Sequence, residues 1–447
     1  MMRAHDRRRT ACRGFTLPEL MVSLVAGLIV TMAVVALART ATRTFYEQIR
    51  TTSAEESLRI AAQRLSNDLS RASFMSTGNI RLDPMIARMA NASDPAANSG
   101  SRYPGLNNLA SLRLYPNGDP AMATPLPLSG TNNLNPQAID ITGNFTSNDQ
   151  YLGTIGLPIA GCGVQAMTLN GDDPTVLRML LQPDGITPAT NQAAIIQSIF
   201  VPVNTTNSVA AANFAARVTD SSGRTHFVVV CAAGMNGAAA FVEFAAPTAG
   251  NIADAVLSAA DTGQIGGVQG FEQLQIAPVQ TVRWSIQRVQ NMRLDPPQDA
   301  NAKYDLFRQY IDAVTGQPVG NPELIAEYVV DMAFALTVDQ GQPPANPQLM
   351  GFDFPDIVNN PAWASANVAT SLPNMPGPQR IRSVRFRLAA RAALPDREAD
   401  MPGPATGFLY RYCIDENAGS AGACTRFARV RTLASEVALI NQARMIY

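Results

Sequence analysis

The sequence predicts an α+β protein in which one long N-terminal helix packs on an antiparallel, β-rich globular domain with large loop insertions. Two observations support this prediction. An apolar run that begins at Leu20 passes into an amphipathic stretch without a turn signal between them. From Ile80 onward, short runs of β-forming residues alternate with stretches rich in Asn, Pro, Ser and Gly.

The apolar run from Leu20 to Ala38 contains no charged side chain. As a helix, residues 15–38 would be roughly 36 Å long, enough to span a bilayer with some tilt. Residues 1–14 hold five arginines and one acid. Positive charge stays in the cytoplasm, so we expect a cytoplasmic N-terminus and an exported remainder. A basic tail for RNA is the alternative, and the closeness of the apolar run favours the membrane interpretation.

The segment 39–73 continues in helix-forming residues and contains neither Gly nor Pro. Its apolar side chains recur mainly every three or four residues, at Phe45, Ile49, Leu58, Ala62, Leu65, Leu69 and Ala72. The pattern predicts one continuous helix to about Ser76, with Gly78 as its stop. Two helices with a break near residues 39–44 are the alternative.

Short β-rich runs follow along the rest of the chain. The expected strands are Ser111–Tyr115, Ala138–Thr142, Phe214–Thr219, Thr225–Cys231, Ala240–Phe244, Thr281–Gln287, Ala326–Val338, Ile381–Ala389 and Phe408–Ile414. The segments 83–136 and 340–379 are rich in turn-forming residues and are interpreted as long surface insertions. The tail 425–446 is either a final strand or a short helix.

A short motif lies at the start of the apolar run. Residues 13–20 are Arg-Gly-Phe-Thr-Leu-Pro-Glu-Leu, which resembles the class III signal peptide of type IV pilins and type II secretion pseudopilins. The resemblance implies that a prepilin peptidase cuts after Gly14 and that Phe15 becomes a methylated N-terminus. Glycine suits this position because it has no side chain to obstruct a peptidase that binds extended backbone.

Glu19 would be the fifth residue of the cut chain. A carboxylate beside a membrane segment is costly unless it has a partner. We expect it to pair, inside a filament, with the N-terminal ammonium of a neighbouring subunit, which would offset the burial of both charges. The alternative is an acid at the level of the lipid headgroups, favoured only by the dipole of its own helix.

Weaker matches downstream are similar to PilW-like minor pilins in the same order along the chain, and the first of them resembles a strand that these share with the J-type pseudopilin. They are Thr281–Ile286, Glu323–Met332, Leu336–Asp339, Ile381–Leu388 and Arg431–Leu439. The resemblance implies a minor pilin that primes a type IV pilus at or near its tip. The alternatives are a J-type pseudopilin of type II secretion, which is usually much shorter, and a signal-anchored periplasmic or adhesin domain.

The resemblance also implies the organisation and the partners of the chain. Residues 1–14 would be a leader, 15–38 a transmembrane and filament-core helix, 39–78 its amphipathic continuation, and 79–447 an exported β-rich domain. The protein would cross the bacterial inner membrane once, with a periplasmic globular domain, and then enter the pilus. The implied partners are other minor pilins, the major pilin, the prepilin peptidase, the inner-membrane assembly platform and a tip adhesin.

Cleavage after Gly14 would remove Cys12 and leave four cysteines on the exported side, an even number that fits disulfides in an oxidising compartment. Cys413 and Cys424 bracket a loop of turn-forming residues and are predicted to pair, which is worth about 3 kcal/mol. Cys162 and Cys231 would form the other pair; two buried free thiols are the alternative.

The sequence offers little for catalysis. Its two histidines are His5, in the leader, and His226, in a predicted strand. It has no nucleophile elbow, P-loop or His-rich metal spacing. The acidic clusters at 170–173 and 415–417 lack the spacing of a calcium loop and are interpreted as turns. The cut chain has 29 basic and 34 acidic side chains, so we predict no enzyme, no cofactor, no metal and no nucleic-acid partner.

Overall fold

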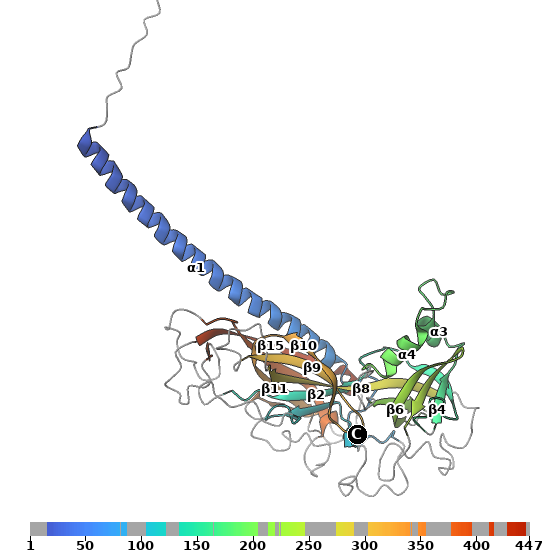
Figure 1. Cartoon of the computed structure of the whole chain (residues 1–447). Coiled ribbons are helices and arrows are strands. Elements are labelled where there is room, and N and C mark those ends of the chain that lie inside the picture. The colour runs from blue at the N-terminus through green and yellow to red at the C-terminus, as the bar shows by residue number, and fades with distance from the viewer. Residues whose placement is uncertain are drawn as a thin grey trace, which may run out of the picture. The chain divides into compact units, whose positions relative to one another are not determined.

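The computed structural model covers the whole chain (Figure 1). The residues that it describes are 16–80, 82–86, 104–121, 134–163, 165–203, 213–219, 223, 225–245, 274–289, 303–339, 341, 347–354, 377–395, 411–414 and 427–443. Within this part of the chain the structure has one long helix and many antiparallel strands, which confirms the α+β class. The chain divides into two compact units, and the boundary along the sequence lies between Ser53 and Ala54.

The long helix α1 runs from Leu17 to Ser70 without a break. It ends six residues before the predicted helix end at Ser76, because the chain turns toward strand β2 (Ala138–Gly143). Ser73 adopts a positive φ of 61°, and its N–H donates to the carbonyl of Thr142 at 2.8 Å. These turns, and not Gly78, terminate the helix.

The first sheet of the second unit is built around one long strand, β8 (Leu274–Arg288). Its second half pairs on one side with β2 and on the other with β9 (Tyr304–Ile311). Strand β1 (Leu112–Tyr115) extends the sheet beyond β2, and β10 (Pro318–Ala326) extends it beyond β9.

The first half of β8 belongs to a closed barrel. The ring runs through β8, β3 (Tyr151–Gly156), β4 (Gln165–Leu169), β7 (Ala239–Phe244), β6 (Thr225–Asn236) and β5 (Phe214–Thr219), and returns to β8. The pairing of β5 with β8 closes it. Helices α3 (Pro174–Leu180) and α4 (Gln192–Phe200) add buried side chains to its core.

The second sheet has the order β12 (Leu349–Phe352), β11 (Val329–Asp339), β13 (Ile381–Arg391), β15 (Phe427–Ala438) and β14 (Arg411–Cys413). The short elements α2 (Pro104–Asn107), η4 (Pro378–Arg380) and α7 (Ile440–Ala443) lie in connections or near the described C-terminal end. The tail therefore forms both a strand and a helical turn.

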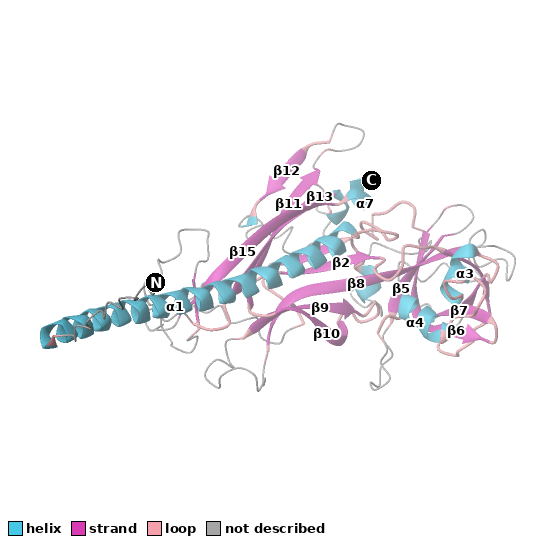
Figure 2. Ribbon diagram, turned by 90° about the horizontal axis from the view of Figure 1, so that it is seen from above, coloured by secondary structure: helices cyan, strands magenta, loops and turns pink. Residues whose placement is uncertain are grey.

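The main core lies between α1 and the two sheets. Buried side chains of α1 from Leu58 to Leu69 pack with residues of β1, β2, β8 and β9 and with residues of β11, β13 and β15. Figure 2 shows the two sets of strands on either side of the helix in projection. This core buries Trp284, Phe334 and Phe386, so the amphipathic half of α1 is held by large apolar contacts.

One predicted strand begins too early. Residues 329–338 of the run Ala326–Val338 lie in β11, whereas Ala326 ends β10 and residues 327–328 form the turn between the two strands. Between them Tyr328 adopts a positive φ of 58°, which reverses the chain into a hairpin. Strands β3, β4, β9, β10 and β12 were not predicted. Residues 408–410 of the expected strand Phe408–Ile414 lie outside the described residues.

Candidate functional site

The described part of the motif forms the first turn of α1. The carboxylate atom Oε2 of Glu19 accepts hydrogen bonds from the backbone N–H of Thr16 at 3.0 Å and from its hydroxyl at 2.8 Å. The spacing Thr-x-x-Glu is that of a capping box, and the Glu19 side chain reaches back to the cap as that motif requires. Pro18 lies in the same turn, where a missing N–H is not needed. In the single chain, Glu19 therefore caps its own helix.

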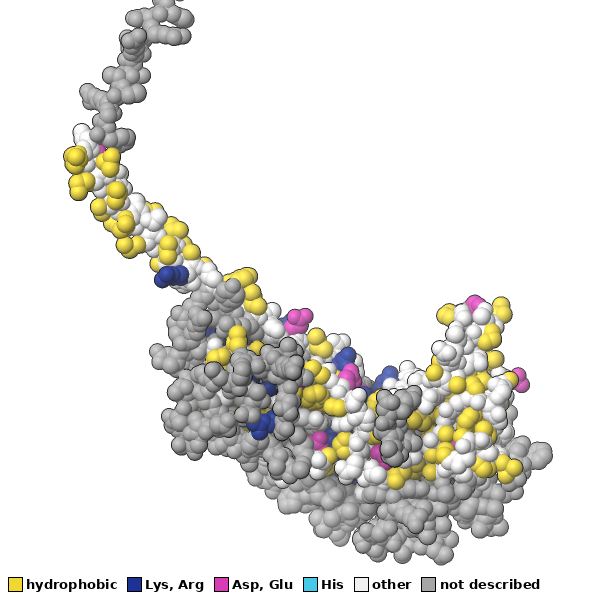
Figure 3. All heavy atoms as spheres, in the orientation of Figure 1, with side chains coloured by type: hydrophobic (Ala, Val, Ile, Leu, Met, Phe, Trp, Pro, Cys, Tyr) yellow, Lys and Arg dark blue, Asp and Glu magenta, His cyan; other side chains and the backbone are white. Residues whose placement is uncertain are grey.

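The helix that follows is long and apolar enough to cross a membrane. The candidate span is Leu17–Thr42, with a mean hydropathy of 2.7, and none of its residues is buried in the structure. Figure 3 shows apolar side chains along its visible face. Its four hydroxyls each donate to a carbonyl one turn earlier, as at Thr31, whose Oγ1 lies 2.6 Å from the oxygen of Gly27. No side-chain hydroxyl of the span is thus left without an acceptor in lipid.

The other residues predicted to act at this site lie outside the described residues. Gly14 and Phe15 precede Thr16, so the cleavage position and the new N-terminus stay predictions. The pairing of Glu19 with a neighbour's amine also stays a prediction.

A network of polar and charged side chains joins the second half of α1 to the first sheet. Oδ2 of Asp68 accepts from Nε1 of Trp284 at 2.9 Å and from Nε of Arg308 at 2.8 Å. Arg308 also faces Glu323 at 3.7 Å, and Glu323 is paired with Arg64, one helical turn before Asp68. The network thus joins one turn of α1 to β8, β9 and β10. The sequence shows these residues only as a polar helix face, because their partners are about 220 to 260 positions away.

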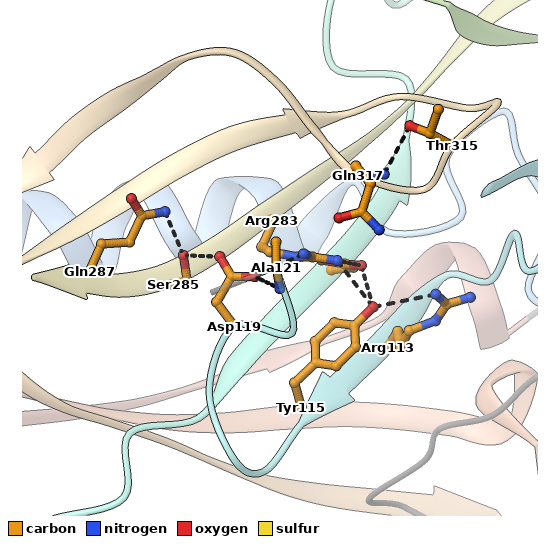
Figure 4. Close-up of polar contacts among 10 residues, drawn as sticks. Arg113, Tyr115, Asp119, Ala121, Arg283, Ser285, Gln287, Thr315 and Gln317 are labelled. Carbon is orange, nitrogen blue, oxygen red and sulfur yellow. Dashed lines mark hydrogen bonds and ion pairs between the residues drawn. The ribbon is translucent and has the colours of Figure 1, made fainter. Parts of the chain in front are cut away.

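A second polar cluster lies inside the first sheet around Arg283 (Figure 4). Its guanidinium pairs with Asp140 at 2.6 Å and Asp119 at 2.9 Å, and all three side chains are at most 6% exposed. Tyr115 donates to Asp140 at 2.7 Å, and burial together with the Asp140 charge raises the pKa of Tyr115 to about 12. The cluster ties β1 and the loop that follows it to β8.

Three residues of the barrel hold one loop in place. Cys162 and Cys231 form a disulfide. Beside it, the buried carboxylate of Glu243 accepts from the backbone N–H groups of Gly163 at 2.7 Å and Ile159 at 3.1 Å, and also from Ala160. The two sulfurs and this carboxylate lie close enough to resemble a metal site, but disulfide sulfurs are not thiolate ligands.

The other predicted cysteine pair is only partly described. Cys413 ends β14, is buried and is disulfide-bonded. Cys424 lies outside the described residues, so the pairing Cys413–Cys424 stays a prediction.

The clusters first considered for calcium lie in two different settings. Asp173 caps α3 and accepts from the N–H of Thr175 and of Leu152. The N–H of Asp172 donates to Asn170 in a turn. These contacts use the oxygens as in ordinary turns. The cluster 415–417 lies outside the described residues.

Replacing Glu243 with Gln is expected to release the loop 159–163. Burial would raise the pKa of Glu243, but the N–H groups of Gly163, Ala160, Ile159 and Cys162 lower it overall. A lowered folded pKa means that the stabilisation is present above the unfolded value of about 4.3 and is lost as the pH falls through the folded value. Each lost hydrogen bond to a charged group is worth about 1.5–3 kcal/mol.

The rate at which a phosphine reduces Cys162–Cys231 measures this release. We expect at least a tenfold faster reduction in Glu243→Gln at pH 7, and a rise in the wild-type rate below about pH 4. Asp184→Asn is the control, because Asp184 caps a different barrel loop through Ile186 and Thr187. Equal rates in all three proteins at pH 7 would contradict the role given to Glu243.

Comparison with known families gives one match. Residues 9–35 match the prokaryotic N-terminal methylation motif. The match supports a type IV pilin-like protein. No curated protein and no solved structure matches the chain.

The matched motif covers Arg9 and Arg13 of the five leader arginines, the capped first turn and most of the apolar run. A prepilin-type motif implies contact with a prepilin peptidase and with other pilins. It also suggests a structural protein and not an enzyme. The apolar helix together with the motif is consistent with anchoring in a membrane.

Proposed function

We propose that this chain is a PilW-like minor pilin that helps to prime a type IV pilus at or near its tip. The observation that carries the proposal is the methylation motif at residues 9–35. The motif overlaps the apolar first part of α1, and the later part of the same helix, from Leu58 to Leu69, belongs to the core of the globular domain. Packing of this helix against those of other pilins would be the mechanism. The chain itself would catalyse no reaction.

The positions of the weaker downstream matches support the finer assignment. Glu323–Met332 spans the hairpin of β10 and β11, and Ile381–Leu388 lies in β13; Thr281–Ile286, which resembles a strand common to both families, lies in β8. These strands contribute to the core that surrounds α1. The PilW-like stretches thus coincide with the part of the fold that holds the helix.

The proposed location follows from the same features. The basic residues before the span would keep the N-terminus in the cytoplasm, and the globular domain would be periplasmic before it enters the filament. The proposed partners are the prepilin peptidase, the assembly platform, the major and other minor pilins, and a tip adhesin.

Sequencing the N-terminus of the protein purified from cells tests the proposal. A processed pilin begins at Phe15, with a methylated amine. A signal-anchored periplasmic domain would retain Met1 or Met2, and that result would overturn the proposal.

A pseudopilin of type II secretion would begin at the same residue. Deletion of the gene distinguishes the two functions. Loss of a minor pilin would abolish piliation, whereas loss of a pseudopilin would abolish protein secretion.

Substitutions at Gly14 are expected to block processing in proportion to side-chain size. Gly14→Ala would slow cleavage and Gly14→Val would stop it, because a side chain at the cleaved bond obstructs the peptidase. The readout is the gel shift between precursor and mature protein in cells with and without the peptidase. Ala41→Val, beyond the motif, is the control, and a normal shift in Gly14→Val would exclude cleavage at this position.

A further inference from the structure

The barrel is inserted between two neighbouring strands of the first sheet, β2 and β8, at the place where a hairpin would have its turn. Strands β2 and β8 pair antiparallel from Ile139 opposite Trp284 to Gly143 opposite Gln280. Gly143 and Gln280 are therefore neighbours in the sheet, although 136 residues separate them in the sequence. In a simple hairpin two residues would suffice to connect such a pair. Residues 144–279 replace that connection.

The barrel has a core of its own. All buried members of its apolar cluster lie between Tyr151 and Ile276, and partly buried contacts from outside come from Tyr310 and Val319. The main core around α1, in turn, has no buried member between Ile141 and Val282. The disulfide Cys162–Cys231 and the Glu243 contacts also begin and end inside the barrel.

Besides Tyr310, Val319 and a few hydrogen bonds, such as that from the N–H of Asn213 to Asp312, the barrel contacts the remainder through a third, smaller apolar cluster. Side chains on the outer wall of the barrel, such as Phe227 and Val229, meet Ile80, Ile86 and Leu109 of the segment that follows α1. This cluster is not part of the core that holds the helix. None of the PilW-like stretches lies within 144–279.

We propose that residues 144–279 are an inserted module that folds around its own core and has a function separate from assembly. The remainder, with α1 and the two sheets, holds the helix and enters the filament. The assembly part of this inference rests on the proposed function, whereas the independence of the two cores does not.

Hydrogen exchange on the full-length protein in detergent tests the independence of the cores. Ile196→Asp places a charge in the barrel core, and Leu388→Asp does the same in the main core; both residues are fully buried. We expect Ile196→Asp to remove protection from β3 to β7 while residues 54–70 and strands β11, β13 and β15 keep theirs. Loss of protection in both regions would overturn the proposal.

Excision tests the separation of functions. The variant joins Gly143 to Gln280 through Asn-Gly, and carries Ile86→Gln and Leu109→Gln because removal of the barrel uncovers these side chains. We expect filament entry within about twofold of the wild type, because the deletion removes no fully buried member of the α1 core and only the partly buried Phe145 at its edge. Glu19→Val in the same deletion is the negative control.

The outcomes separate the two proposals. A deletion variant whose first and second sheets stay protected but which fails to enter filaments would overturn the separation of functions alone. A deletion variant that has lost protection in β11, β13 and β15 would overturn the independent core. A wild-type chain that never enters filaments would instead overturn the proposed function.

Discussion

Glu19→Val is expected to abolish entry into the filament while leaving insertion into the membrane intact. Valine lengthens the apolar run, so the helix still partitions into lipid. It removes the one acid of the candidate span, and with it the partner proposed for the N-terminal ammonium of a neighbouring subunit. An ammonium left unpaired in an apolar core costs several kcal/mol. Sheared pili and membrane fractions, probed with an antibody to the globular domain, give the two readouts.

Glu19→Gln separates the proposed charge pairing from the capping contact that the structure shows. The amide oxygen of glutamine can still accept the hydrogen bonds from Thr16, so the capped first turn is retained. It carries no charge to pair with an ammonium. We therefore expect Glu19→Gln to fail in assembly as Glu19→Val does. Normal entry of Glu19→Gln would assign the residue to helix capping alone and would exclude the charge pairing.

Arg283→Met is expected to destabilise the globular domain by about 3–5 kcal/mol. Burial would lower the pKa of Arg283, but the charges of Asp140 and Asp119 and the Tyr115 hydroxyl raise it, so the guanidinium stays charged in the sheet. Methionine fills a similar volume but leaves both carboxylates buried without their cation. Urea unfolding followed by tryptophan fluorescence measures the loss, because Trp284 is the next residue and is fully buried.

An exposed ion pair provides the matched control. Arg385 pairs with Asp353, and their side chains are 45% and 63% exposed. Exposed pairs are worth about 0–1 kcal/mol, so Arg385→Met should shift the urea midpoint little. If the two variants unfolded at the same urea concentration, the buried cluster would contribute no more than a surface contact.

Local sequence patterns were sufficient for the helix and for several strands. The uncharged run from Leu20 and the later spacing of Leu58, Leu65 and Leu69 depend only on neighbours along the chain, and α1 contains all of them. Its end at Ser70 was missed because the bond from Ser73 to Thr142 links residues far apart in sequence. The hairpin at Tyr328 was missed because its turn lacks the Gly or Asn that normally marks a positive φ.

The candidate site divides in the same way. Glu19 could be singled out from sequence because an acid stands directly before an uncharged apolar run, whereas its capping contact with Thr16 was not predicted. The contacts of Asp68 with Trp284 and Arg308 could not, since they depend on which strand faces the helix. Three barrel strands were predicted, but the barrel was missed because β3 and β4 are short and contain Gly and Ala, which are depleted in strands.

The lysine content has a consequence for labelling experiments. Lys303 is the single lysine among 34 basic residues, and the sheet buries it to 4% exposure. Its Nζ lies 2.9 Å from Glu327 and 3.5 Å from Asp305. Amine-reactive dyes and cross-linkers therefore find no accessible lysine on the folded domain. Fluorescent dyes that react with surface amines would therefore not label the globular domain of this subunit. Reagents directed at carboxylates or at arginine are suited to locating it.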